Sequence, residues 1–120
     1  MTLNEYQMRA MTTCLPTSAN PLYMLFEIGE EYGELLGKFS KYIRKNKIKF
    51  DNNELLSAMN EEEFKEWREL VFKELGDIIW GVAGICEVLG TNLETIAEMN
   101  NEKLSSRQDR GKIDGSGDNR

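Results

Sequence analysis

The run Glu74-Leu-Gly-Asp-Ile-Ile-Trp-Gly-Val-Ala-Gly-Ile-Cys86 carries apolar residues on several sides of a helix, and Asp77 is the only charge after Glu74. This pattern predicts a buried core helix. Glu74 and Asp77 are three residues apart, so they share one helix face. A lone carboxylate such as Asp77 must be paired, protonated or bound to a metal if it is buried, because burial of a bare charge is costly.

The rest of the chain predicts an all-α fold, a bundle of four main helices. The helix around the opening run is expected to begin after an Asn60 cap and to end near Leu89, before Gly90. Apolar spacing predicts further helices over 2–14, over 21–45 behind Asn20, and from Asn92 through 104. We expect a connector over 50–60 with a turn at 51–53, a short helical turn at 54–59, and no strand. The domain is expected to cover 1–109, followed by a glycine-rich tail over 110–120.

The composition excludes several classes of function. The 120 residues suit one helix-rich domain, and the net charge of −6 disfavours nucleic-acid binding through a basic surface. The chain has no histidine, which excludes histidine general bases and makes a catalytic zinc site unfavourable. We expect a cytoplasmic protein with no signal peptide, no membrane span and two reduced cysteines.

A second acidic group, Glu30-Glu31-Tyr-Gly-Glu34, places carboxylates one helical turn apart. Together with Glu74 and Asp77 it would form an all-oxygen cage suited to Mg²⁺. The competing interpretation is a solvated surface cluster, which is common for glutamates on a helix. Glu31 and Glu34 border the apolar stripe of their helix, which favours the metal site.

Basic and polar residues form two further groups. Asn100, Lys103 and Arg107 make one stripe on the last helix, which is either ordinary exposed surface or a set of donors for a polyphosphate. The end of the second helix has cations and no acid, and it is read as a solvated face that complements the helix dipole or as an attractor of phosphate. Its members are Lys38, Lys41, Arg44, Lys45, Lys47 and Lys49.

These motifs together resemble the MazG-type, all-α nucleoside triphosphate pyrophosphohydrolases. The hallmark E-E-x-x-E followed by E-x-x-D is matched by Glu30-Glu31-Tyr-Gly-Glu34 and Glu74-Leu-Gly-Asp77. The stretch 92–104 and the ending 107–118 are also similar to single-domain bacterial and phage members. The gap between the two acidic motifs is longer than is usual in this family, and the excess falls in 46–63.

The resemblance implies a role for each matched residue. It implies that Glu31, Glu34, Glu74 and Asp77 ligate Mg²⁺, with Mn²⁺ as a substitute. It implies that Glu30, with Glu31 and Glu34 in the catalytic group, orients the attacking water or supports the ligands. Lys103 and Arg107 would hold phosphates, with Asn100 nearby. Trp80 would stack on the base or serve as a core aromatic, and the tail at 115–117 would close over phosphates or remain disordered.

The implied reaction is Mg²⁺-dependent hydrolysis of a ribo- or deoxyribonucleoside triphosphate between its α- and β-phosphates, giving a monophosphate and pyrophosphate. The resemblance also implies a homodimer or homotetramer with a site completed at a helix-lined interface. Alternatives are a related α,β-pyrophosphatase, either dUTPase-like or a phosphoribosyl-ATP pyrophosphohydrolase. An alternative of another class is a non-enzymatic helical interaction module.

Overall fold

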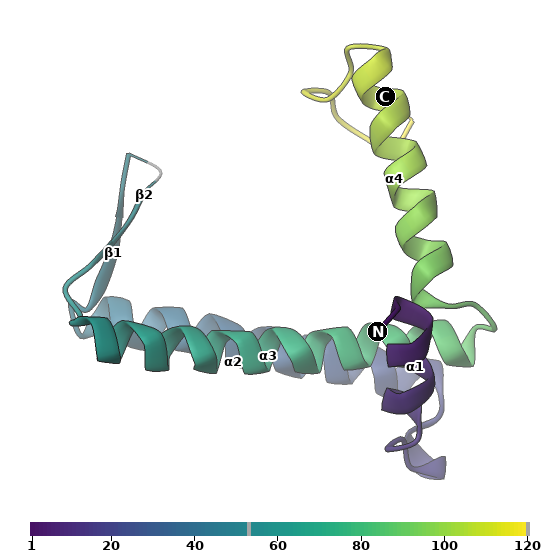
Figure 1. The fold of residues 1–120 in the computed structure, drawn as a ribbon, viewed down its shortest axis with the longest axis horizontal. Helices are drawn as coiled ribbons and strands as arrows, with labels where there is room; N and C mark the ends of the chain where they lie inside the picture. The colour runs from purple at the N-terminus through teal and green to yellow at the C-terminus, as the bar shows by residue number, and fades with distance from the viewer. Residues whose placement is uncertain (53, 120) are drawn as a thin grey trace.

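A long antiparallel pair of helices forms the body of the molecule (Figure 1). The computed structural model describes residues 1–52 and 54–119. The elements in chain order are α1 (Leu3–Met11), a short 3₁₀ turn (Pro16–Ser18), α2 (Pro21–Arg44), β1 (Ile48–Asp51), β2 (Glu54–Ser57), α3 (Glu61–Val88) and α4 (Leu93–Asp109). The predicted helical character and the four main helices are confirmed for the described residues.

The helix starts follow the sequence closely. Asn20, Asn60 and Asn92 each accept a hydrogen bond from the backbone N–H three residues later, as expected of N-caps. Thr2 does the same for α1, and the Glu5 carboxylate accepts a hydrogen bond from the Thr2 backbone N–H, which completes a capping box. These side chains satisfy backbone donors that a helix start leaves unpaired, so the chain enters each helix at a defined residue.

The expectation of a strand-free connector with a helical turn at 54–59 is wrong. β1 and β2 pair antiparallel, with Ile48 opposite Ser57 and Phe50 opposite Leu55. Asn52 has φ of 50°, a left-handed conformation that asparagine tolerates, so the chain can reverse after β1. The all-α class is therefore corrected to a mainly helical fold with a two-stranded hairpin. The predicted turn at 51–53 falls partly on residue 53, which lies outside the described residues.

The hairpin is anchored through one apolar cluster at its end of the helix pair. Ile48 packs with the buried side chains of Trp67 and Val71 on α3. The ring of Phe39 meets Trp67 edge to face, with 5.1 Å between centroids. The Trp67 indole N–H donates to the Lys38 carbonyl oxygen at 2.9 Å, which ties α3 to α2.

Two glycines on α3 allow α2 to approach closely. A Cβ at Gly81 would lie 2.6 Å from Ile28 Cγ1, and one at Gly84 would collide with the sulfur of the fully buried Met24. By contrast, Gly29, Gly33 and Gly37 on α2 have open space beside them. Within this chain, Gly81 and Gly84 are therefore the glycines that allow close approach of the two helices.

Gln7 fixes the junction of α1, α3 and α4. Its side-chain nitrogen donates to Glu87 and to the Thr91 carbonyl oxygen, and its side-chain oxygen accepts from the Leu93 backbone N–H at 2.9 Å. This buried amide thus fastens α1 to the turn that starts α4. Ala83, Cys86 and Leu93 form a second apolar cluster at this junction, with Tyr6 against it.

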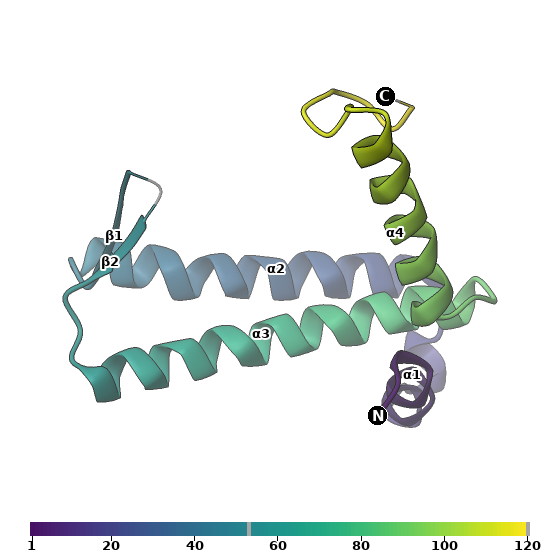
Figure 2. The same ribbon diagram turned by 45° about the horizontal axis from the view of Figure 1, so that its top comes forward.

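The four helices do not close into a compact bundle. In both views α4 projects from one end of the α2–α3 pair and the hairpin projects from the other end, toward the same side (Figures 1 and 2). The radius of gyration is 17.8 Å, whereas a compact 120-residue domain has about 14 Å. Within the described residues, we find no helix that combines the length and apolarity needed to cross a bilayer.

Candidate metal centre

Three carboxylates meet between α2 and α3. One oxygen each from Glu31, Glu74 and Asp77 lies within 4.8 Å of the other two. Glu31 comes from the first acidic motif, and Glu74 and Asp77 come from the second, so the antiparallel pairing of α2 and α3 brings the two motifs together as expected. We call these three residues the carboxylate cluster.

The members of the carboxylate cluster differ in solvent exposure, and Asp77 is more exposed than the sequence predicted. Glu74 is the buried member, 7% exposed, whereas Asp77 is exposed within the chain. Leu75 and Ile79 beside it are also 41% and 47% exposed. The expectation that Asp77 is a lone carboxylate on a buried face is therefore wrong for the single chain, because its side of α3 faces solvent.

Lys38 provides the positive charge next to Glu74. Its Nζ lies 2.9 Å from Glu74 Oε1, and this hydrogen bond raises the pKa of Lys38. The basic run 38–49 was expected to be mostly a solvated face. Lys38 instead pairs with Glu74, and Lys47 Nζ lies 3.5 Å from Glu63 Oε2.

Glu31 is the most perturbed carboxylate of the cluster. Burial raises its pKa from the ordinary 4.5 to about 7, and the charge of Asp77 contributes next. Smaller contributions in the same direction come from Glu34, Glu27 and Glu74. Like charges held this close disfavour ionisation, and a divalent cation would relieve that repulsion.

The other predicted members of the acidic site lie further out. Glu34 is exposed and is not one of the three converging carboxylates, although its charge still acts on Glu31. Glu30 is also exposed, and its catalytic role stays a prediction. Sequence reasoning missed Glu27, which precedes Glu31 by four residues and so shares its helix face. That spacing would have identified it.

Tyr6 was also missed. Burial raises the pKa of its phenol, and the charge of Asp77 raises it further, so the ring from α1 lies near the carboxylate cluster. No sequence motif connects these two residues, because they meet only through the tertiary placement of α1 against α3.

An apolar groove runs from this region toward α4. Tyr6, Gly76 and Ile79 line one part of it together with the N-terminal residues, including Leu3. Leu3 and Ile79 also line the next part, which has a volume of about 560 Å³ and reaches Asn100 and Lys103 on α4. The structure thus connects the surroundings of Asp77 with two of the predicted substrate-binding residues along one surface.

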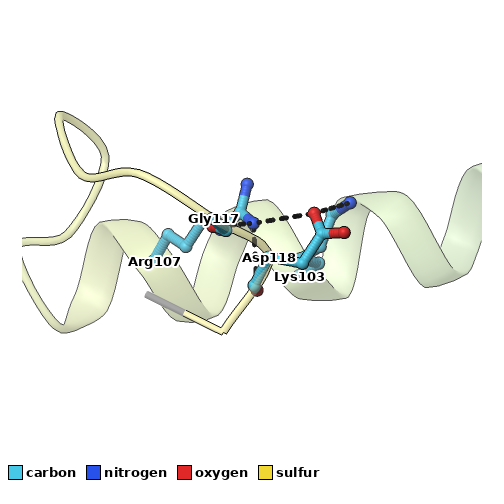
Figure 3. Close-up of polar contacts among 4 residues, drawn as sticks. All are labelled: Lys103, Arg107, Gly117 and Asp118. Atoms are coloured by element: carbon cyan, nitrogen blue, oxygen red, sulfur yellow. Dashed lines mark hydrogen bonds and ion pairs between the residues drawn. The ribbon is translucent and has the colours of Figure 1, made fainter.

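The cationic stripe of α4 contacts the C-terminal tail. Arg107 is 5% exposed, and its Nη2 donates to the carbonyl oxygens of Gly117 and Asp118 at 3.3 and 3.0 Å (Figure 3). Asp118 Oδ1 lies 3.5 Å from Arg107 Nη2 and 3.7 Å from Lys103 Nζ. The expected tail over 110–120 therefore folds back on α4 through the described residues up to 118.

Trp80 makes a structural contact. Its indole N–H lies 2.9 Å from Thr13 Oγ1 and 3.3 Å from the Ala10 carbonyl oxygen, so it holds the end of α1 against α3. Trp80 is only half-buried, so it lies at the edge of the helix packing and not in the core that was offered as one interpretation. Its stacking on a base stays a prediction.

The fold and the site define a mainly helical protein with a carboxylate cluster between two long antiparallel helices. The chain is 32% identical over 127 aligned positions to the "Gene 37 protein" of Mycobacterium phage L5, and the alignment covers 100% of both chains. The chain therefore belongs to the same family as this phage protein. No protein-family model matches the chain, and no solved structure matches it significantly.

Proposed function

We propose that this protein hydrolyses nucleoside triphosphates between the α- and β-phosphates in an Mg²⁺-dependent reaction, as a MazG-type pyrophosphohydrolase. The observation that carries the proposal is the convergence of Glu31, Glu74 and Asp77 from two helices on one point. The sequence resemblance of the two acidic motifs to the MazG-type enzymes supports the same reaction class.

The donor set of the carboxylate cluster fits Mg²⁺. Mg²⁺ prefers oxygen ligands at 2.0–2.1 Å, so two ligands of one ion lie at most about 4.2 Å apart. The separations within 4.8 Å therefore require only small side-chain movements. Glu31, Glu74 and Asp77 would hold the ion, and Glu34, one turn beyond Glu31, would complete or support its shell. Mn²⁺ has similar ligand preferences and would substitute.

The reaction needs little covalent chemistry from the protein. When bound, Mg²⁺ supplies Lewis-acid polarisation of the phosphoryl oxygens and neutralises their charge. Glu30 would accept a proton from the attacking water, and Glu31 and Glu34 would act with it in the catalytic group. Lys103 and Arg107 would neutralise the leaving pyrophosphate. The apolar groove between the cluster and α4 would receive the base and sugar.

A homo-oligomer is part of the proposal, because the single chain leaves too much surface uncovered. Its accessible surface is 8850 Å², about a third more than the roughly 6,600 Å² typical of a monomer of this mass. A standard interface buries about 800 Å² per partner, so the excess corresponds to about two to three such contacts. The exposed apolar residues of α2 are Leu22, Leu25, Phe26, Tyr32, Leu36 and Ile43.

The related α,β-pyrophosphatases use the same kind of cage, so a dUTPase-like or phosphoribosyl-ATP activity is the nearest alternative. The non-enzymatic module explains the exposed apolar faces equally well. It gives no reason for Glu31 and Asp77 to converge on the buried Glu74, because the repulsion among three carboxylates costs stability unless a further cation is bound.

A pyrophosphate-release assay on the eight common ribo- and deoxyribonucleoside triphosphates with Mg²⁺ tests the proposal. We expect release by the wild type and a loss of at least about 100-fold in Asp77→Asn, because the variant removes a ligand charge. Glu69→Gln, an exposed carboxylate on the same helix, is the matched control and should retain activity. Equal rates for Asp77→Asn and Glu69→Gln would exclude the carboxylate cluster as the site of reaction.

A further inference from the structure

The tail of the chain places a carboxylate against the two cations of α4. Lys103 and Arg107 are four residues apart, so they lie on one face of the helix. Asp118 Oδ1 lies 3.7 Å from Lys103 Nζ and 3.5 Å from Arg107 Nη2. Figure 3 draws these three residues and Gly117 with their polar contacts. One oxygen thus contacts both cations. A charged, non-bridging oxygen of a phosphate group can be shared between such a pair in the same way.

The backbone after α4 turns back, so that the tail lies against Lys103 and Arg107. The Gly111 backbone N–H donates to the Gln108 carbonyl oxygen and the Lys112 N–H donates to the Arg107 carbonyl oxygen, which closes the end of α4. Gly111 and Gly117 have φ of 63° and 79°, a region that L-residues with side chains rarely adopt. The first of these residues turns the chain back from the end of α4, and the second lies directly before Asp118.

The ion pair contributes little to the stability of the bound tail, because the Asp118 side chain is exposed to water. Arg107 is 5% exposed, whereas the Asp118 side chain is 88% exposed. Exposed ion pairs contribute little stability, because water solvates the carboxylate well without the cation. Among the described residues, Arg107 Nε is buried without a hydrogen-bond partner, so the guanidinium has donor capacity that the tail does not use.

We propose that Asp118 is a tethered competitor that occupies the phosphate position at Lys103 and Arg107 until a di- or triphosphate displaces it. A diphosphate carries more charge and more acceptor oxygens than one carboxylate, so it would win the exchange, whereas a singly charged anion would not. The bound tail lowers the apparent affinity of the protein for phosphate, because only the molecules in which the tail is free can bind it. The tail would also compete with pyrophosphate after the reaction and assist its release.

This inference deepens the proposed function, because it rests on Lys103 and Arg107 as the phosphate-binding cations. The sequence suggested a different role for the tail, closure over bound phosphates through its backbone N–H groups. The two roles predict opposite responses. A competitor leaves when phosphate binds, whereas a lid becomes more ordered.

Isothermal titration of the full-length protein with pyrophosphate, in low salt without divalent cations, tests the exchange. We expect Asp118→Asn to bind pyrophosphate about two- to five-fold more tightly than the wild type, the range that loss of one exposed ion pair allows. Asp114→Asn changes the net charge equally within the same tail, and we expect it to bind as the wild type does. Arg107→Gln added to Asp118→Asn should abolish the gain.

Amide hydrogen exchange of residues 112–118 with and without pyrophosphate is the second measurement. We expect faster exchange in the complex, because the tail is displaced. Slower exchange would overturn the proposal in favour of a lid, and equal tightening in Asp114→Asn and Asp118→Asn would overturn it as a general charge effect. Neither readout requires turnover. A protein that exchanges its tail for pyrophosphate but cleaves no triphosphate would contradict the proposed function alone.

Discussion

Lys38 and Glu74 form an ion pair across the interface of α2 and α3, with 2.9 Å between Lys38 Nζ and Glu74 Oε1. Glu74 is also a member of the carboxylate cluster. Lys38 therefore partly neutralises the charge that a divalent cation would neutralise more fully. This dual use of Glu74 connects the stability of the helix pair with metal binding.

Replacement of Lys38 should separate these two effects. In chelator, Lys38→Met leaves Glu74 buried without its cation and should lower the free energy of unfolding. With Mg²⁺ added, the variant should gain more in Tm than the wild type, because the ion no longer competes with the lysine. Thermal unfolding checks both, with the exposed Lys41→Met as control. Identical unfolding of the two variants would show that the ion pair has no such role.

The raised pKa of Glu31 predicts a stability that depends on pH. Its folded pKa of about 7 lies above the ordinary value of 4.5, so the folded state binds a proton more tightly than the unfolded state between these values. In chelator, this group's contribution should make the protein less stable as pH rises from about 4.5 to about 7. Denaturant unfolding at pH 5.5 and 7.5 measures the effect, and Glu31→Gln should reduce it. An unchanged pH dependence in Glu31→Gln would assign the effect elsewhere.

The ionisation of Glu31 should also make the affinity for Mg²⁺ depend on pH. Mg²⁺ binding requires Glu31 to be ionised, so the affinity should rise as pH increases through about 7. The gain should be smaller in Glu31→Gln. Calorimetric titration with Mg²⁺ at the two pH values would measure it, and an affinity independent of pH would exclude Glu31 as a ligand.

Much of this fold follows from the sequence because its signals are local. Asn20, Asn60 and Asn92 cap helices through bonds within three residues, so each helix start could be read from short segments. The strands over 48–51 and 54–57 were missed because four residues give too little alternation. Their pairing also depends on Ile48 reaching Trp67, a contact between distant parts of the chain.

The candidate site shows the same division between local and tertiary information. Spacing within each helix correctly grouped Glu74 with Asp77, and the antiparallel helix pair added Glu31 to them. Sequence alone could not show that Asp77 is exposed or that Lys38 contacts Glu74, because both depend on how α2 lies across α3. Tyr6 near Asp77 and the clamp by Gln7 arise from the position of α1 and have no motif.

Gly84 should be the glycine that the helix pair requires. A Cβ there would collide with Met24, which is fully buried, so Gly84→Ala should destabilise the protein by about 1–3 kcal/mol. Gly33→Ala has open space and should instead gain up to about 1 kcal/mol of helix propensity. Chemical denaturation of both variants gives the comparison. A stable Gly84→Ala protein would mean that α2 and α3 pack further apart.

Phe26 should belong to the interface between copies. It is 70% exposed on α2, so Phe26→Asp should leave the helix intact while it disfavours an apolar contact with a second chain. Analytical ultracentrifugation should give a multiple of 13.8 kDa for the wild type and a smaller species for the variant. Ser40→Asp, an exposed position on the same helix, is the control. A wild type that sediments as a single chain would contradict the proposed homo-oligomer.

The position of bond cleavage tests the central claim most directly. Phosphorus NMR of the preferred triphosphate with Mg²⁺ would follow its products, for the wild type and for Glu74→Gln. We predict that the wild type yields the nucleoside monophosphate and pyrophosphate in equal amounts, and that Glu74→Gln yields neither at a comparable rate. A nucleoside diphosphate with inorganic phosphate, or the same products from Glu74→Gln at the wild-type rate, would contradict α,β-hydrolysis at the carboxylate cluster.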